Sequence, residues 1–131
     1  MEKLILIAGP CVVESEEITM HIAGEVVRLG AAYDLNLIFK ASYRKANRTR
    51  GDSFSGIGDQ QALEILAKIR NTFGVRVTTD VHSAEEARMA AEYVDILQIP
   101  AFLCRQTDLL VFPVLPAATS RSVWRPRKAG I

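Results

Sequence analysis

Short apolar runs alternate with helical patterns along most of the chain. The runs are rich in β-branched residues and lie at positions 4–8, 37–41, 75–80 and 94–100. Each of the first three runs precedes a stretch in which apolar residues recur at the spacing of a helix, and a further helix is expected near Arg105. Apolar strands that alternate with amphipathic helices predict an α/β fold with a parallel sheet covered by helices.

End signals and apolar stripes define the first two helices. Ser15 is expected to cap the first helix, and Gly30 is expected to end it. The apolar face predicted for this helix consists of Ile18, Ile22, Val26 and Leu29. The second helix is predicted to begin near Asp59 and to stop at Gly74. Its predicted apolar stripe consists of Ala62, Leu66, Ile69 and Phe73.

Polar and unusual residues follow the ends of the predicted strands. They are Cys11, Lys40, Lys45, Asp80, His82 and Gln98. In parallel sheets of this kind, function is located at the C-terminal ends of the strands. The pattern therefore predicts a site at that edge of the sheet.

Composition limits the kinds of protein that this chain can be. Its 131 residues suffice for one domain with a core, and the net charge of +1 argues against a general nucleic-acid binder. No apolar run reaches the length of a membrane span, and no signal-peptide pattern opens the sequence, so a cytoplasmic location is expected. Two cysteines far apart in the sequence do not predict a disulfide framework.

A local cluster of positive charge stands out against this neutral background. Five of the eleven residues from 40 to 50 are basic, and none is acidic. A solvated surface loop is the simplest interpretation. However, Lys40 ends an apolar strand, where an amine is costly unless an anion neutralises it. Asn47, Arg48 and Thr49 add a set of donors suited to a sugar phosphate.

The other candidates each allow more than one interpretation. Cys11 is either a small buried hydrophobe or a metal ligand, with His82 as a weakly supported partner. Asp80 precedes a capping box at 83–86, and it can orient a hydroxyl, bind a metal or cap the next turn. Gln98 is either a buried amide or a substrate contact.

Four segments resemble one enzyme family closely. "IAGPCVVESEE", "FKASYRKANRT", "TTDVH" and "LQIPAFLCRQTDLL", in this order and spacing, are similar to the 3-deoxy-D-manno-octulosonate 8-phosphate synthases over residues 1–110. The resemblance implies a (β/α)8 barrel, usually a homotetramer, that condenses phosphoenolpyruvate with D-arabinose 5-phosphate and releases phosphate. This reaction belongs to lipopolysaccharide biosynthesis. Neither a nucleic acid nor a membrane is an expected partner.

The resemblance also implies roles for individual residues. Cys11 corresponds to a ligand of a divalent metal in the metal-dependent class. Lys40, Lys45 and Asp80 correspond to catalytic residues of the pocket. The substrate-binding positions implied by the same motifs are Asn47, Arg48, Thr49, Gln98, Pro100, Ala101 and Phe102. Phe102 is expected to approach the site of an adjacent subunit.

Two details of the loop bear on which enzyme this is. The related DAHP synthases carry Lys-Pro-Arg-Thr for erythrose 4-phosphate, whereas "KANRT" here favours the five-carbon aldose. Arg44 departs from the family, since many members have Asp there, and its ion pairing is open. A DAHP-synthase-like or sialic-acid-type enzyme and a non-catalytic sugar-phosphate-binding or assembly module are the alternatives.

The last part of the chain breaks the pattern. A full barrel needs about 250 residues and eight strands, and only four strands are predicted here. Residues 111–131 hold three of the five prolines and four basic residues but no acidic one. We expect an N-terminal half-barrel over 1–110 and an irregular or disordered tail over 111–131. A reading-frame change and a mis-called gene end are the two hypotheses for the origin of this tail. The remaining metal ligands are expected outside this chain.

Overall fold

The computed structural model describes residues 2–44 and 57–107. Strands and helices alternate in the order β1 (Ile5–Ala8), α1 (Glu16–Ala32), β2 (Asn36–Lys40), α2 (Asp59–Phe73), β3 (Arg76–Asp80), α3 (Ala84–Ala91) and β4 (Ile96–Gln98), followed by the 3-10 helix η1 (Ala101–Leu103). The predicted α/β class and all four predicted strands are confirmed. The tail at 111–131 lies outside the described residues.

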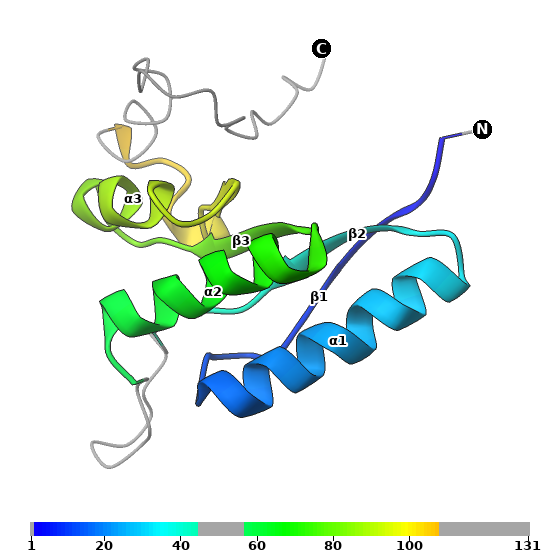
Figure 1. Cartoon of the computed structure of the whole chain (residues 1–131). Helices are drawn as coiled ribbons and strands as arrows, with labels where there is room; N and C mark the ends of the chain where they lie inside the picture. Colours follow the sequence, from blue (N-terminus) through cyan, green and yellow to red (C-terminus); the bar gives the residue numbers. More distant parts are fainter. Residues whose placement is uncertain (1, 45–56, 108–131) are drawn as a thin grey trace.

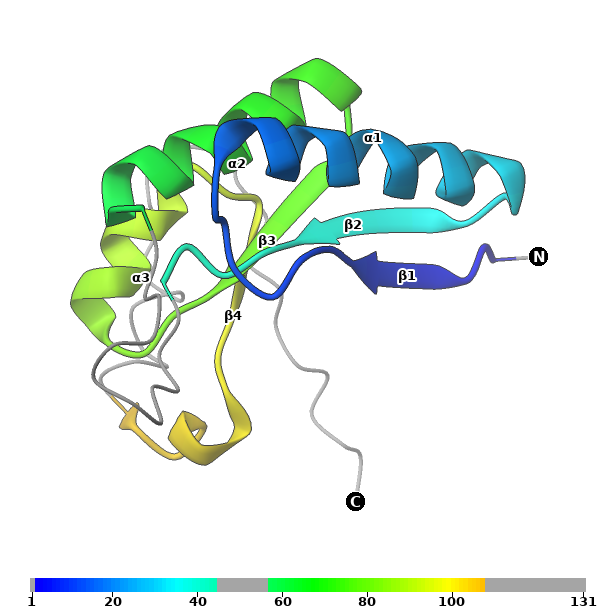
Figure 2. The ribbon, with the colours of Figure 1, turned by 90° about the horizontal axis from the view of Figure 1, so that it is seen from below.

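The four strands form one parallel sheet in the order β1-β2-β3-β4. In Figure 1 the chain steps from strand to helix to neighbouring strand, and Figure 2 shows α1 and α2 covering the same face of the sheet. The core between these layers includes the fully buried Phe39, Leu66 and Val77. Consecutive parallel strands with helices on one face are the arrangement of the first βα units of a TIM barrel.

The predicted helix ends are largely confirmed. Ser15 Oγ accepts a hydrogen bond of 3.2 Å from the backbone N–H of Ile18. Gly74 closes α2 in the left-handed region, at φ 63°, where glycine has no steric penalty. Ser83 caps α3, but the Glu86 carboxylate accepts from the backbone N–H of His82 and not from that of Ser83. The capping box is therefore offset by one residue.

The face that α1 buries differs in part from the prediction: Ile22 packs against the core as predicted, but the two ends of the predicted stripe do not. Ile18 and Leu29 are 50% and 42% exposed, whereas Thr19, Ala23 and Gly30 are buried. Gly30 also lies inside the helix, which continues to Ala32. A Cβ atom on Gly30 would lie 3.3 Å from the Cβ of Leu37, so the small residue allows α1 to approach β2 closely. Small size, and not hydrophobicity alone, determines which side of α1 faces the sheet. The stripe predicted for α2 is confirmed.

Both outer edges of the sheet lack a strand partner in the described part of the chain, and part of the face opposite the helices is exposed. β1 has β2 as its strand partner there, and no other described strand pairs with its outer edge. Ala8 pairs in register with Phe39, whose side chain lies in the core under the helices. Side chains alternate between the two faces of a strand, so Ile5 and Ile7 lie on the face opposite the helices. Each of these isoleucines is 56% exposed.

None of the helices in the described residues combines the length and apolarity that crossing a membrane requires.

Candidate active site

The sheet brings the predicted strand-end residues to one edge. Lys40 is the last residue of β2 and pairs in register with Thr78, and Asp80 pairs with Gln98 at the ends of β3 and β4. Beyond the regular strands, the backbone N–H of Ser42 donates to the carbonyl of Cys11 at 3.3 Å. The sequence therefore placed Cys11 and these strand ends at the same edge correctly.

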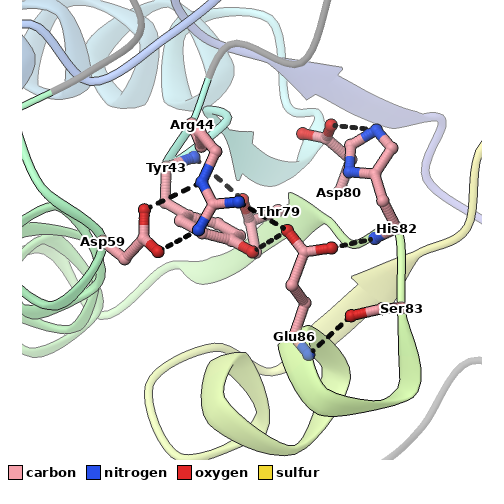
Figure 3. A network of polar contacts seen from close by, with 8 residues as sticks. All are labelled: Tyr43, Arg44, Asp59, Thr79, Asp80, His82, Ser83 and Glu86. Atoms are coloured by element: carbon pink, nitrogen blue, oxygen red, sulfur yellow. Dashed lines mark hydrogen bonds and ion pairs between the residues drawn. The ribbon is translucent and has the colours of Figure 1, made fainter.

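Asp80 holds a hydroxyl group and lies next to an imidazole. Its Oδ1 accepts a hydrogen bond from Ser42 Oγ, and its Oδ2 lies 3.6 Å from Nε2 of His82. Of the three uses considered for Asp80, a hydroxyl partner is present in Ser42, and the N-cap of α3 is Ser83. Figure 3 shows the Asp80 and His82 side chains lying beside each other at the end of β3.

A buried tyrosine joins the end of β2 to the start of α3 (Figure 3). Tyr43 is 1% exposed, and its hydroxyl donates to Glu86 Oε1 at 2.5 Å. Its backbone N–H donates to Thr79 Oγ1 at 3.3 Å. Burial and the neighbouring Glu86 carboxylate raise the pKa of Tyr43 well above its ordinary range. The phenol therefore remains a hydrogen-bond donor at all physiological pH values.

Arg44 has carboxylate partners from two helices. Its Nε donates to Asp59 Oδ1 at 3.0 Å, its Nη2 binds Asp59 Oδ2, and its Nη1 lies 3.7 Å from Glu86 Oε1. The guanidinium carbon also lies 5.8 Å from the centroid of the Tyr43 ring. The hydrogen bond to Asp59 raises the pKa of Arg44 further above its high ordinary value. The ion pairing of Arg44, which the sequence left open, is thus defined.

Several residues of this region were not identified from the sequence. Ser42, Tyr43 and Thr79 carried no motif that pointed to a polar network, and Glu86 was predicted only as part of a helix cap. Tyr43 and Glu86 are separated by 43 positions. Local patterns extend over one or two helical turns, so they contain no information about a partner at that distance.

The described residues do not form a complete metal site. Over 2–44 and 57–107, no group of three or more His, Cys, Asp or Glu side chains is placed to hold a metal ion. Cys11 is exposed, so the interpretation of it as a buried hydrophobe is wrong. A single thiolate cannot supply the four ligands that a tetrahedral site needs.

The remaining predicted site residues differ in how they are placed. Gln98 is exposed, which excludes its interpretation as a buried amide. Pro100 is half-buried and precedes η1, in which Ala101 and Phe102 are both exposed. Phe102, at 73% exposure, also lies with its ring centroid 6.3 Å from that of His82. The last four predicted residues, Lys45, Asn47, Arg48 and Thr49, lie outside the described residues.

The fold and the polar strand ends define the class of this protein: it is an α/β protein of the TIM-barrel type with a candidate site at the C-terminal edge of its strands. A profile of the DAHP synthetase I family matches residues 1–119, and the chain belongs to this family.

Curated relatives with high identity share one name, 2-dehydro-3-deoxyphosphooctonate aldolase. The protein from Desulfatibacillum aliphaticivorans is 55% identical over 107 residues, which are 82% of this chain and 39% of the relative. The protein from Methylibium petroleiphilum is 55% identical over 105 residues, 80% of this chain and 37% of the relative. That from Methylobacterium radiotolerans is 52% identical over 120 residues, 92% of this chain and 41% of the relative. The chain thus spans about two fifths of the length of these relatives.

Proposed function

We propose that the chain forms the N-terminal part of an enzyme that condenses phosphoenolpyruvate with D-arabinose 5-phosphate to 3-deoxy-D-manno-octulosonate 8-phosphate and phosphate. The observation that carries this proposal is the convergence of Lys40, Asp80 and Gln98 at one sheet edge, and in the sequence "KANRT" follows five residues after Lys40. The names of the relatives support the same reaction. The enzyme is proposed to be cytoplasmic and, when full length, a homotetramer.

The proposed reaction needs positive charge at the place where two anionic substrates meet. C3 of the enol attacks the aldehyde carbon of the aldose, water adds at C2, and the C2–O bond to phosphate later breaks to release inorganic phosphate. Lys40, half-buried at the end of β2, is suited to neutralise phosphoenolpyruvate. Lys45 is proposed to act beside it, near the carbonyl oxygen on which negative charge develops.

The remaining residues are proposed to bind and orient the aldose. Asn47, Arg48 and Thr49 supply donors for its phosphate. The Asp80 carboxylate, which already accepts from Ser42, has the acceptor chemistry to orient a sugar hydroxyl. Gln98 can donate or accept beside it, and the nearby wall is proposed to consist of Pro100, Ala101 and Phe102.

The metal of this family would need ligands beyond the described residues. Cys11 is the one residue of this chain that we propose as a ligand, and the described donor set around it does not complete a site. No step of the reaction is therefore assigned to a metal here. The relatives contain about three fifths of their length outside the matched region, and we propose that the other ligands come from there.

Binding and turnover can be tested separately. Calorimetry on the 131-residue chain should give tighter binding of D-arabinose 5-phosphate than of D-erythrose 4-phosphate or inorganic phosphate. Turnover is expected in a chimera that joins residues 1–107 to the remaining part of the Desulfatibacillum relative, measured as phosphate release with both substrates and a divalent metal. Lys40→Gln should abolish turnover. Lys68→Gln is the matched control, because Lys68 pairs with Glu16 on the helix surface.

The outcomes distinguish the alternatives. Faster turnover with erythrose 4-phosphate would identify a DAHP-synthase-like enzyme. Aldose binding by the chain, together with an inactive chimera, would favour a non-catalytic binding module. Full activity in the Lys40→Gln chimera would refute the proposed site.

A further inference from the structure

The described helices cover one face of the sheet. The buried core contains residues of α1, α2 and α3 together with the strand residues Phe39, Val77 and Leu97, so these helices pack on the same side. On the opposite face, Ile5 and Ile7 of β1 are each 56% exposed. Sheets made of parallel strands occur almost always with both faces covered. The face that carries these two isoleucines therefore calls for a partner.

Exposure on this face is concentrated at β1. Ile7 pairs in register with Ile38 of β2, and Ile38 is 5% exposed. Thr78 of β3 lies on the same face by register and is 2% exposed. Leu4, directly before β1, is 73% exposed. The exposed apolar surface thus follows the strand that forms one edge of the sheet.

Both edges of the sheet are available for strand pairing. Among the described strands, β1 has β2 as its neighbour and β4 has β3, and neither has a second one. Unpaired edges present backbone N–H and C=O groups to which another strand can bind. Figure 2 shows the strand direction turning from β1 through β3 to β4. A sheet that turns in this way curls toward closure and does not extend as a flat ribbon.

A second copy of the chain fits both edges at once. Neighbouring strands are parallel throughout, so all four run in one direction. A two-fold rotation about an axis along the sheet preserves this direction and places β4 of each copy parallel to β1 of the other. Two sheets of four strands then form an eight-stranded barrel, the size at which side chains fill the interior. Antiparallel pairing between the two β1 strands would leave both β4 edges open.

We propose that this chain forms a homodimer in which β1 of each copy pairs with β4 of the other. Ile5 and Ile7 then enter the shared interior. Branched apolar side chains dominate the interior of barrels of this type, and these two residues supply that chemistry. The dimer does not depend on the proposed reaction, since no substrate takes part in it.

Sedimentation velocity of the purified 131-residue chain tests the dimer. The expected species has twice the monomer mass of 14.5 kDa, and it should not grow further with concentration, because a closed barrel leaves no free edge. Ile7→Asp should raise the dissociation constant at least about 100-fold, roughly tenfold for each copy, since the dimer would bury the new carboxylate.

Ile18→Asp is the matched control for this substitution. Ile18 is 50% exposed on α1, which packs on the other face of the sheet. Its dissociation constant should stay within about twofold of that of the parent chain. Circular dichroism verifies the fold of each variant. If Ile7→Asp does not fold, Ile7→Thr keeps a β-branched side chain and should still weaken the dimer about tenfold.

Cross-linking identifies the strands that meet. Cys11 follows β1, Gln98 ends β4, and both are exposed. Parallel pairing places them near each other across the dimer, whereas within one copy β2 and β3 separate their strands by about 14 Å. In a chain with Gln98→Cys and Cys104→Ser, a bis-maleimide with a shorter spacer should yield a covalent dimer. Cys104→Ser alone should yield little, because the two Cys11 residues lie on opposite sides of the barrel.

Several results would overturn the proposal. A monomer at all concentrations, as expected if another segment of the chain covers β1, would do so. A dimer that Ile7→Asp leaves unchanged, or that Ile18→Asp weakens equally, would also contradict it. A dimer without the cross-link between Cys11 and position 98 would refute the pairing of β1 with β4, and assemblies that grow beyond two copies would refute closure.

Discussion

Glu86→Gln removes one charge and replaces one acceptor by a donor at the centre of the polar network. The Glu86 side chain is only 15% exposed, and its two oxygens accept from Tyr43 Oη and from the backbone N–H of His82. Glutamine has one carbonyl oxygen and one amide NH2 group. If the NH2 group faces the backbone N–H of His82, two donors meet. If it faces Tyr43, the phenol oxygen can accept from it, but the phenol proton then loses the acceptor that Glu86 provided.

The expected cost follows from these contacts. An unsatisfied buried donor costs about 1–3 kcal/mol. The contact with Arg44 adds little, because it is 3.7 Å long and the Arg44 side chain is 48% exposed. Loss of a carboxylate in the first turn of α3 adds about 0.3–1 kcal/mol through the helix dipole. We therefore expect the free energy of unfolding to fall by about 2–3 kcal/mol.

Urea unfolding followed by circular dichroism measures this effect, and Glu85→Gln is the control. Glu85 also lies in the first turn of α3, but it is exposed. This control should lose less than about 1 kcal/mol, since it changes only the dipole contribution. The midpoint of Glu86→Gln should be lower by roughly 1 M urea with an unchanged slope. A difference between the two variants below about 0.5 kcal/mol would refute the view that Glu86 fastens Tyr43 to the turn before α3.

Two further predictions concern Tyr43 and Gly9. Because the pKa of Tyr43 is raised in the folded chain, its contribution to stability is complete below about pH 10, the ordinary tyrosine value, and is lost as the pH rises beyond it. Tyr43→Phe should therefore lower the free energy of unfolding by about 1 kcal/mol at pH 7. The variant should also lose less stability than the parent chain as the pH rises above about 10. An equally steep loss in both proteins would contradict the role given to the Tyr43 hydroxyl. A Cβ on Gly9 would overlap the backbone carbonyl of Lys40, so thermal unfolding of Gly9→Ala should show a loss above about 2 kcal/mol. Gly24→Ala is the control, because Gly24 lies inside α1 and an added Cβ makes only ordinary contacts there. Its free energy of unfolding should rise by up to about 1 kcal/mol. Equal effects of the two variants would refute the close approach of the chain after β1 to the end of β2.

The sequence alone determined the order of strands and helices and the edge of the sheet where polar residues gather. These features depend on neighbours within a few positions: the period of apolar residues, the hydroxyls of Ser15 and Ser83 at helix starts, and Gly74 at a helix end. The parallel order then brought Lys40 and Asp80 to the same edge without further information.

Only the tertiary structure decided which side of α1 is buried and what Arg44 does. The apolar period pointed to Ile18 and Leu29, but close packing against β2 selected the side that carries Gly30. In the sequence Arg44 was one more cation of a basic segment, whereas in the folded chain its charge is matched by Asp59 and Glu86. Such partners come from different βα units, and their distance in space is determined by how the helices pack on the sheet, which no local pattern records.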